Sequence, residues 1–503
     1  MIEEIDKPDA MNIEEIQELF TSNQEEDKNT EEILSVGKEL EKELTHEYPY
    51  LFDVYDKVTI QSAYSFAEDY KNYLDEAKTE REAVKYDITY LKNLGFVDIK
   101  SKDKLIPGDK VYFNIHNKGL MAAVIGKNSV KDGFNVLGSH IDSPRFDLKP
   151  NPAYEDNGLA YFKTHYYGGV KKYQWTALPM AIHGVVTRRD GSQVEIVIGE
   201  EENDPVFMFT DLLIHLAKDQ MKKSPSKVVE GEQFNLLVGG RPVEYKDVSK
   251  RFKLGLLQIL NERYGITERD LISAELEVVP AGKSRDIGFD RSLLTGYGED
   301  DSACAYPALR ALAAQSNLDR TAVIMLTDKE EIGSFGNTGA QSQIYENFFV
   351  EIYKKTEEEY DELSFLQALE NSYMISSDVG AGYDPNFSSA FDPKNTAYLG
   401  KGVAFNKYTG SAGKAGASDA SSEYFTKVLH ILDENDVPWQ TGELGKVDQG
   451  CGGTIAHLQA KRGIQVIDCG VPMLSMHAPF DVTHKLDVYN CYQVYCAFLE
   501  HME

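Results

Sequence analysis

An apolar run that ends in two adjacent glutamates most constrains what this chain can fold into. Residues 322–326 are continuously apolar, and the chain then continues as Thr327-Asp-Lys-Glu-Glu-Ile-Gly333. A short run of this kind, bounded by a glycine-bearing turn, predicts a buried strand of an α/β sheet. Ligands of open α/β sheets bind outside the carboxyl ends of the strands, where Glu330 and Glu331 fall. Alone, the pair is equally compatible with two solvated glutamates in a loop.

Three further short apolar segments each lead into a residue that can bind a metal. The first ends at His140, the second leads into Asp378, and the third leads through a connecting segment into His477. Each predicted strand or loop delivers its side chain to one rim of the sheet, so we expect these side chains to lie together with the glutamates. The predicted strands cover residues 134–138, 373–376 and 464–467.

A glycine-punctuated acidic loop supplies a further carboxylate. The segment Gly296-Tyr-Gly-Glu-Asp-Asp-Ser302 runs into a helix-like stretch at residues 305–314. A dinuclear site needs one carboxylate that bridges two ions about 3.5–4 Å apart, and Asp300 is the bridging candidate. Mixed imidazole and carboxylate ligands suit zinc and leave positions open for water, so we expect two Zn²⁺ per subunit, with Mn²⁺ or Co²⁺ as substitutes. The predicted terminal ligands are His140, Glu331, Asp378 and His477.

Two carboxylates are predicted to act beside these ligands. Glu330 lies next to a ligand and is itself free, so it could take the proton from the attacking water and pass it to the leaving amine. Asp142 lies two residues beyond His140 and could accept the other imidazole N–H, which would fix the ring. Any single histidine is more often structural than ligating, so the hypothesis rests on the whole set of positions fitting one scheme.

The composition argues against several classes of partner. The chain has 503 residues, of which 42% are hydrophobic and 27% charged, and its formal net charge is -30. Nucleic acids and anionic membranes are polyanions, so neither is expected as a main partner. No apolar run is long enough to span a membrane, and the N-terminus does not resemble a secretory signal. The five cysteines lack C-x-x-C spacing, which favours reduced thiols and a cytoplasmic location.

Changes in composition and periodicity along the sequence predict an N-terminal extension and a catalytic domain that is interrupted by an inserted domain. The N-terminal stretch is acidic with short amphipathic patches, and it is followed by a helical pattern over 62–94. Short alternating segments with turn signals then indicate an inserted domain rich in β-structure, with further helical stretches at 210–222 and 248–263. The first domain resumes afterwards and closes with a helix over 486–501. The predicted boundaries are 1–47 for the extension, 48–150 and 286–503 for the catalytic domain, and 151–285 for the insert.

Together these motifs resemble the M18 family of metallopeptidases, the group of aspartyl aminopeptidase and aminopeptidase I. The resemblance runs in family order from about residue 60 to the C-terminus. The matching segments are Gly138-Ser-His-Ile-Asp-Ser-Pro144, Asp300-Asp301, Asp328-Lys-Glu-Glu-Ile-Gly-Ser334, Met374-Ile-Ser-Ser-Asp378, Cys451-Gly-Gly-Thr-Ile455 and Met473-Leu-Ser-Met-His477.

The resemblance implies a fold, an activity and an assembly. It implies an α/β, mixed-sheet zinc-peptidase catalytic domain with an inserted β-rich dimerisation domain, acting as a metal-dependent aminopeptidase on the N-terminal peptide bond of peptides. The implied metal ligands are the five named above, with Glu330 as the base and Asp142 as the ligand-orienting acid. It also implies a tetrahedral homododecamer built from dimers, with the active sites facing an inner chamber.

Three further residues are predicted to contact the substrate. His215 matches a family histidine that reaches a neighbour's site, although a core histidine on a helix fits the same pattern. Lys407 could meet an acidic side chain, or it could be a surface lysine. Gly453, in the turn at 452–454, could offer backbone amides to the scissile carbonyl.

The sequence departs from relatives that select acidic N-terminal residues. Such relatives tend to carry an Asp-Arg pair shortly after a tryptophan, whereas Trp175 is followed here by Thr-Ala-Leu-Pro. Without that planar donor, we expect a preference broader than acidic, or one shifted toward neutral or basic side chains. Asp301 and Asp384, expected near the site, would favour a cationic side chain.

Two alternatives come from other classes. A metal-dependent N-acyl amino acid deacylase or dipeptidase would use a similar site but would need groups that bind a free substrate carboxylate. A non-catalytic assembly protein would be expected to lose the glutamate base first, and the chain retains both Glu330 and Glu331.

Overall fold

The computed structural model describes residues 37–411 and 413–503. The chain divides into two compact units, with the boundary between Tyr48 and Pro49. Of the predicted acidic extension, only residues from 37 onward are described, and 37–44 form a helix. The remainder of that prediction lies outside the described residues. Every site discussed below lies in the larger unit.

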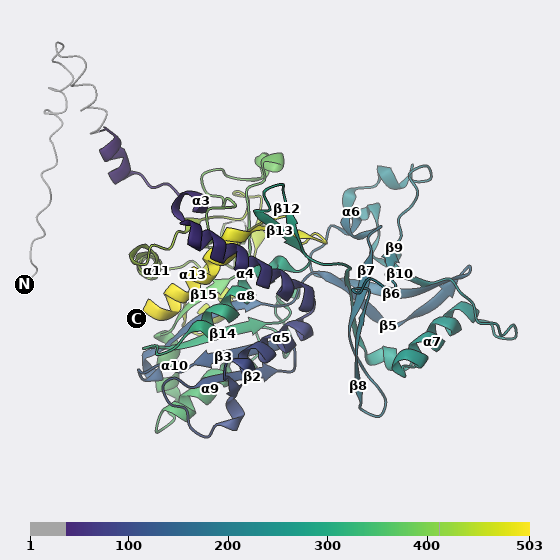
Figure 1. Ribbon diagram of the computed structural model, residues 1–503, viewed down its shortest axis with the longest axis horizontal. Helices are drawn as coiled ribbons and strands as arrows, with labels where there is room; N and C mark the ends of the chain where they lie inside the picture. Colours follow the sequence, from purple (N-terminus) through teal and green to yellow (C-terminus); the bar gives the residue numbers. More distant parts are fainter. Residues whose placement is uncertain (1–36, 412) are drawn as a thin grey trace, which may run out of the picture. The chain divides into compact units, whose positions relative to one another are not determined.

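A nine-stranded mixed sheet forms the centre of the catalytic domain (Figure 1). Its four central strands run parallel, and antiparallel strands flank them on both sides. All four predicted strands of the sequence pattern are confirmed, and they are these four central strands. The strand order is β1 (Val97–Asp98), β2 (Lys110–Ile115), β3 (Gly119–Val124), β14 (Thr321–Thr327), β4 (Phe134–His140), β15 (Tyr373–Ser377), β21 (Gln465–Gly470), β17 (Ala404–Asn406) and β19 (Gln440–Thr441).

Helices cover both faces of this sheet, which explains why β14 is apolar on both faces from Ala322 to Leu326. Successive side chains of β14 point to opposite faces, so Ile324 packs in one core and Val323 in the other. One face is covered by α4 (Lys57–Glu76), α5 (Glu80–Asn93), α8 (Glu299–Ala314), α11 (Ser422–Glu434) and α13 (Lys485–His501). The other is covered by α9 (Ile344–Thr356), α10 (Glu362–Glu370) and α12 (Ala456–Ala460).

Strands of a small five-stranded sheet lead into or follow several of the loops near the carboxyl ends of the large sheet's central strands. Its strand β13 leads into the acidic loop, β16 follows Asp378, and β22 leads into His477. The strand order is β12 (Arg285–Ile287), β13 (Leu293–Gly296), β23 (Asp481–His484), β22 (Pro472–Leu474) and β16 (Gly380–Ala381).

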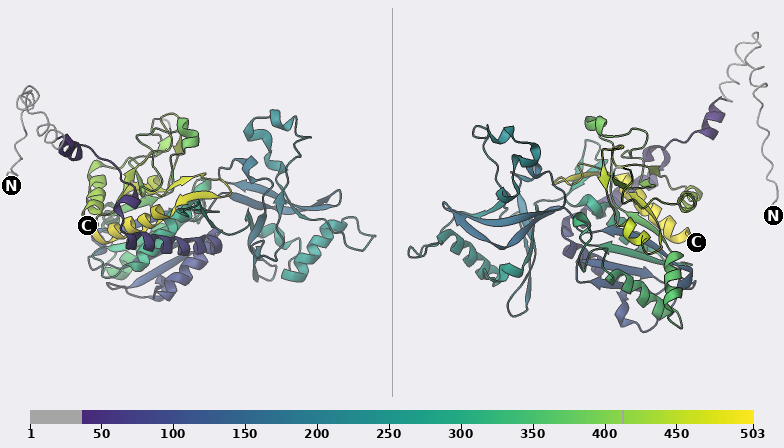
Figure 2. Two further views of the ribbon diagram at one scale, coloured as in Figure 1. Left: turned by 45° about the horizontal axis from the view of Figure 1, so that its top comes forward. Right: turned by 180° about the vertical axis from the view of Figure 1, so that it is seen from behind.

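The inserted segment forms a separate seven-stranded antiparallel sheet (Figure 2). The core of this sheet contains several aromatic side chains. Phe146 contacts Trp175, Phe209 and Phe234 in that core. The sheet begins at Arg145 and ends at Pro280, so both ends precede the expected limits of 151 and 285. The strand order is β8 (Gln193–Ile198), β7 (Met180–Thr187), β11 (Glu275–Pro280), β5 (Arg145–Asp156), β6 (Leu159–Tyr167), β10 (Asn235–Gly239) and β9 (Met208–Phe209).

Two predicted helical stretches differ in the structure. The pattern over 62–94 is two helices, because Thr79 and Glu82 form a capping box that starts α5 afresh. The stretch at 210–222 is mostly turns and ends in a short 3₁₀ helix, Gln220–Lys222. By contrast, the stretch at 248–263 is confirmed as α7 (Arg251–Tyr264), and the closing helix is α13.

Candidate metal centre

Parallel strands bring the predicted ligands to one edge of the large sheet. His140 is the last residue of β4, and Asp378 directly follows β15. Glu331 lies in a 3₁₀ turn, Glu330–Ile332, just after β14. Asp300 lies in the first turn of α8, and His477 follows β22. All five side chains, together with Glu330, line one cavity of about 650 Å³.

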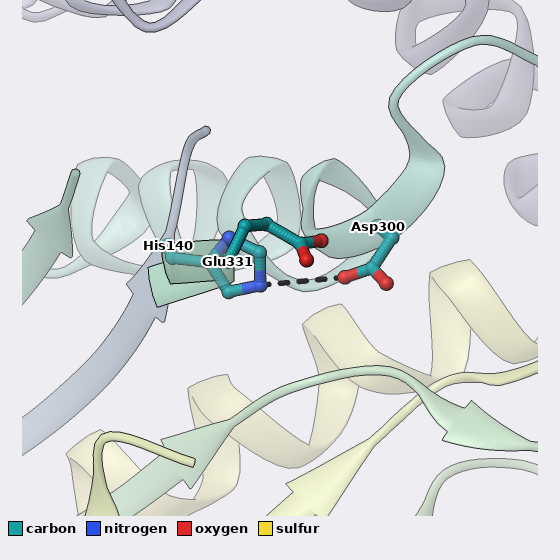
Figure 3. A group of neighbouring side chains, drawn as sticks. All are labelled: His140, Asp300 and Glu331. Carbon is teal, nitrogen blue, oxygen red and sulfur yellow. Dashed lines mark ion pairs between the residues drawn. The ribbon is translucent and has the colours of Figure 1, made fainter. Parts of the chain in front are cut away.

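Asp300 lies between the two histidines of the site. Its Oδ1 atom is 3.3 Å from His140 Nε2, and its Oδ2 atom is 3.2 Å from His477 Nε2. Figure 3 shows the first of these contacts, with Glu331 beside it. A second carboxylate approaches each histidine: Asp378 Oδ1 is 3.8 Å from His140 Nε2, and Glu331 Oε1 is 3.4 Å from His477 Nε2. The donors therefore form two sets that share Asp300.

The spacing and the unmet hydrogen-bonding capacity of these donors fit metal ions. Ligand atoms around a tetrahedral zinc with bonds of about 2.0–2.1 Å lie about 3.3 Å apart, close to the separations in both sets. Among the described residues, the buried Asp300 Oδ1 and Glu331 Oε1 have no hydrogen-bond donor. Glu330 also comes within ligand distance of His140 and Asp378, where all three donor atoms lie within 4.8 Å of one another.

Both histidines present the same ring nitrogen to the site. His140 Nδ1 donates to the backbone carbonyl of Asp142 at 2.9 Å, and His477 Nδ1 donates to the carbonyl of Gly169 at 2.7 Å. A carbonyl can only accept, so each Nδ1 carries a hydrogen, and in the neutral ring Nε2 then holds the lone pair. That tautomer is the one that can ligate a metal through Nε2.

The electrostatics of the cluster favour a bound cation. Burial raises the pKa of Glu330 to about 8, and the neighbouring Asp378 adds to the shift. Burial and Asp300 likewise raise the pKa of Glu331. For Asp300 burial acts in the same direction, but the contacts with the imidazoles of His140 and His477 outweigh it and lower the pKa. A divalent cation would offset the repulsion among these carboxylates and hold them ionised.

Asp142 makes more contacts around the site than the sequence predicted. Its carboxylate accepts the backbone N–H groups of Glu330 at 3.0 Å and Glu331 at 3.3 Å, and the hydroxyl of Tyr167 at 2.8 Å. The carboxylate Oδ1 is 3.4 Å from His140 Nδ1, so the backbone carbonyl of Asp142 is the nearer partner of that ring. Asp142 therefore connects the histidine strand to the glutamate turn.

Of the three predicted substrate-binding residues, one lies in the described lining of the cavity and two do not. Gly453 lines the cavity. His215 and Lys407 are not among the described residues that line it. His215 is exposed in a turn, which contradicts its interpretation as a core histidine on a helix. Lys407 is also exposed and lies 3.7 Å from Asp419.

The two acidic residues expected near the substrate do not face it. Asp301 is buried and accepts hydrogen bonds from the Ser139 hydroxyl and, at 3.3 Å, from the backbone N–H of His140. Asp384 caps a short helix by accepting the backbone N–H of Asn386 at 2.9 Å. Neither belongs to the described lining of the cavity, so the argument from these residues for a cationic side chain is wrong.

Sequence reasoning missed the segment Tyr167-Gly168-Gly169, which contacts the site from the insert. Tyr167 reaches Asp142, and the carbonyl of Gly169 reaches His477, as described above. Two consecutive glycines directly after β6 were the available signal, since they permit a close approach of the backbone.

Comparisons with known proteins identify the family. Residues 73–499 match the family described as Aminopeptidase I zinc metalloprotease (M18). A protein from Clostridium acetobutylicum named probable M18 family aminopeptidase 1 is 49% identical over 461 residues, which cover 91% of this chain and 99% of that protein. In the described residues, no helix is both long and apolar enough to cross a membrane.

Solved structures agree with this assignment. The crystal structure of an M18-family aminopeptidase from Thermotoga maritima superposes with a TM-score of 0.88 at 41% identity, covering 91% of this chain and 100% of that one. Aminopeptidase I from Clostridium acetobutylicum gives 0.84 at 47% identity, covering 91% and 100%. A yeast mApe1 dodecamer, 21% identical with a TM-score of 0.70, covers 87% of this chain and 96% of that one and shares the fold. The chain belongs to the M18 family of zinc metalloaminopeptidases.

Proposed function

We propose that this aminopeptidase removes single residues from the N-terminus of peptides. The reaction would use two zinc ions that share one bridging carboxylate. The observation that carries the proposal is the position of Asp300, whose two oxygens face different histidines at 3.3 and 3.2 Å. His140 and Asp378 would hold one ion, and His477 and Glu331 the other. When bound, such a pair of ions polarises the scissile carbonyl and makes water acidic enough to attack at neutral pH.

Glu330 is the proposed general base. Its side chain lines the cavity and is adjacent in sequence to Glu331, which belongs to the His477 set. Its backbone N–H is held by Asp142, so the carboxylate projects from a fixed turn. In this position it would take a proton from the attacking water and return it to the leaving amine, which is the role of a carboxylate base beside a metal site.

The substrates are proposed to be unfolded peptides whose first side chain is not required to be acidic. The two lysines that line the cavity already have partners: Lys414 Nζ is 3.3 Å from Asp419, and Lys446 Nζ donates to the Ser389 carbonyl at 2.6 Å. Gly453 exposes its backbone to the same cavity and is the proposed contact for the scissile carbonyl.

The proposed assembly is a tetrahedral homododecamer built from dimers, with the insert between 145 and 280 forming the dimers. Exposed apolar side chains on the insert support this proposal, because Leu213, Ile214 and Leu216 are 58%, 64% and 69% exposed. The yeast protein that shares the fold is described as a dodecamer. His215 lies within this exposed stretch, so we propose that it serves the site of a neighbouring subunit. A cytoplasmic location is supported by four free cysteines, Cys304, Cys469, Cys491 and Cys496.

The activity can be tested with three substrates and the zinc-loaded protein. Leu-Gly-Gly should release free leucine, N-acetyl-Leu-Gly-Gly should remain intact, and N-acetyl-leucine should not be deacylated. Mass spectrometry of the products identifies each reaction. Release of acetate from N-acetyl-leucine, or failure to cleave the tripeptide Leu-Gly-Gly, would favour a deacylase or a dipeptidase and contradict the proposal.

A further inference from the structure

The end of strand β6 connects the insert to both halves of the metal centre. The hydroxyl of Tyr167 donates to Asp142 Oδ2 at 2.8 Å, and Asp142 in turn holds the glutamate turn and lies beside His140. Two residues later, the carbonyl of Gly169 accepts Nδ1–H of His477 at 2.7 Å. One short segment of the insert thus contacts Asp142, which lies beside His140, and also contacts His477 directly.

Gly168, between Tyr167 and Gly169, also lies close to a residue of the metal centre. Gly168 has φ +76°, and a Cβ added to it would lie 3.2 Å from Glu331 Oε2 and 3.4 Å from Glu331 Cβ. Both the left-handed backbone and the close approach to a ligand favour glycine at this position. The backbone of the insert therefore forms part of the wall behind Glu331.

A buried arginine packs against the ring of Tyr167. The guanidinium carbon of Arg145 lies 4.0 Å from the ring centroid, and Arg145 is only 5% exposed. Arg145 is itself surrounded by carboxylates, at 2.9 Å from Asp147, 3.2 Å from Glu277 and 3.4 Å from Glu80. Asp147 and Glu277 belong to strands of the insert, whereas Glu80 begins α5 of the catalytic domain. The ring is thus fixed where the two domains meet.

We propose that Tyr167 is a positioning residue for the metal centre, acting through Asp142. The inference rests on the proposed dinuclear function and extends it to a residue of the insert. Asp142 Oδ2 has two donors, the Tyr167 hydroxyl at 2.8 Å and the longer Glu331 N–H at 3.3 Å. Without the hydroxyl, Oδ2 keeps only the longer bond, and the Glu330 N–H at 3.0 Å from Oδ1 is the one remaining short bond that orients the carboxylate among its described partners. The outer partners of metal ligands typically control metal affinity or activity by about 10- to 100-fold.

The test compares Tyr167→Phe with Tyr166→Phe in the zinc-loaded full-length protein. Tyr167→Phe removes one oxygen and keeps the ring against Arg145. Tyr166 is the adjacent residue on β6, is 41% exposed, and makes no described side-chain hydrogen bond through its hydroxyl, so it is a matched control. The measurements are the rate of zinc transfer to a chromogenic chelator, kcat and KM on leucyl-nitroanilide, and the melting temperature of the zinc-free protein.

We expect Tyr167→Phe to release zinc about tenfold faster and to lower kcat about tenfold, with KM changed by less than about twofold. Tyr166→Phe should match the wild type in all of these. The proposal is overturned if both variants release zinc at the wild-type rate, if both are impaired to the same degree, or if Tyr167→Phe changes only KM or only the melting temperature.

Zinc transfer also separates this inference from the proposed function. If the wild-type protein fails to cleave peptides but Tyr167→Phe still releases zinc about tenfold faster than Tyr166→Phe, the positioning role stands and the proposed function fails. If peptides are cleaved and the two variants behave alike, the proposed function stands and the positioning role fails.

Discussion

Asp300 turns its Oδ2 atom toward His477, whose Nε2 lies 3.2 Å away, while its other oxygen faces the opposite histidine of the site. Two oxygens that face different histidines are the arrangement expected of a carboxylate that bridges two ions. The two oxygens come from one buried side chain in the first turn of α8, so whatever moves that turn moves both halves of the site together.

Replacing Asp300 by asparagine should disturb both zinc positions. The amide offers one oxygen and one N–H group, and the N–H group cannot ligate the second ion. Elemental analysis should show a lower zinc content than in the wild type. The affinities for both zinc ions should fall together. Asp448→Asn, at another carboxylate that lines the cavity, is the control and should retain the wild-type zinc content. Full occupancy of both positions in Asp300→Asn would show that Asp300 is not the bridge.

Replacing Glu330 by glutamine should abolish turnover without removing the metal. A positioned general base contributes about 10²–10⁴-fold, so kcat should fall by at least about 10²-fold. Zinc content and oligomeric state should remain as in the wild type, because Glu330 is not one of the five proposed ligands. Glu443→Gln, which changes another glutamate of the cavity wall, is the control. Near-normal kcat in purified Glu330→Gln would exclude it as the base.

Much of this centre was predictable because it lies at the ends of parallel strands. The strands that lead to His140, Asp378 and the glutamate turn are short and apolar, so their type and their common edge follow from the local sequence. The contacts of Tyr167 and Gly169 were not predictable in this way, because they join residues of the insert to residues distant in the chain. Their geometry depends on how the insert's sheet meets the catalytic domain.

Two helical stretches differ from their sequence patterns for local reasons. The stretch over 62–94 is helical as predicted, and the Thr79-x-x-Glu82 capping box marks the start of its second helix. The stretch at 210–222 contains a helical spacing of apolar residues, yet Leu213, Ile214 and Leu216 are exposed in this chain. Apolar residues with helical spacing form a helix most readily when a surface covers them, and no described residue of the chain buries these three.

Protonation of His484 should destabilise the fold below neutral pH. Burial lowers the pKa of His484 from 6.5 to about 4, and its Nδ1 accepts the backbone N–H of Leu486 at the start of α13. The folded protein therefore binds this proton more weakly than the unfolded chain. The contribution is fully present above about pH 6.5 and is lost as the pH falls through about 4, amounting to about 3 kcal/mol.

His484→Asn provides the comparison, since asparagine can cap the helix and does not titrate. The melting temperature of the wild type should fall more between pH 7.5 and pH 5 than that of the variant, with both proteins measured in the same buffers. Equal falls in the two proteins would contradict the assignment of this pH dependence to His484.

The preference for the N-terminal residue should be broader than acidic. No arginine lines the described cavity, and its lysines are engaged by Asp419 and by the Ser389 carbonyl. The absence of a charge-assisted contact worth about 1.5–3 kcal/mol lowers the preference for Asp or Glu by about one to two decades. Values of kcat/KM for Asp-, Glu-, Leu- and Lys-nitroanilides at equal zinc loading should be at least as high for Leu as for Asp or Glu. A preference of about tenfold or more for the acidic substrates would show that the argument from the missing arginine is wrong.

The central claim is a pair of zinc ions joined by Asp300, and anomalous diffraction at the zinc absorption edge tests it most directly. Crystals of the zinc-loaded protein should give two anomalous peaks about 3.5–4 Å apart. One peak should lie beside His140 and Asp378, the other beside His477 and Glu331, with one oxygen of Asp300 directed at each. A single peak in the cavity, or two peaks of which only one contacts Asp300, would contradict the account.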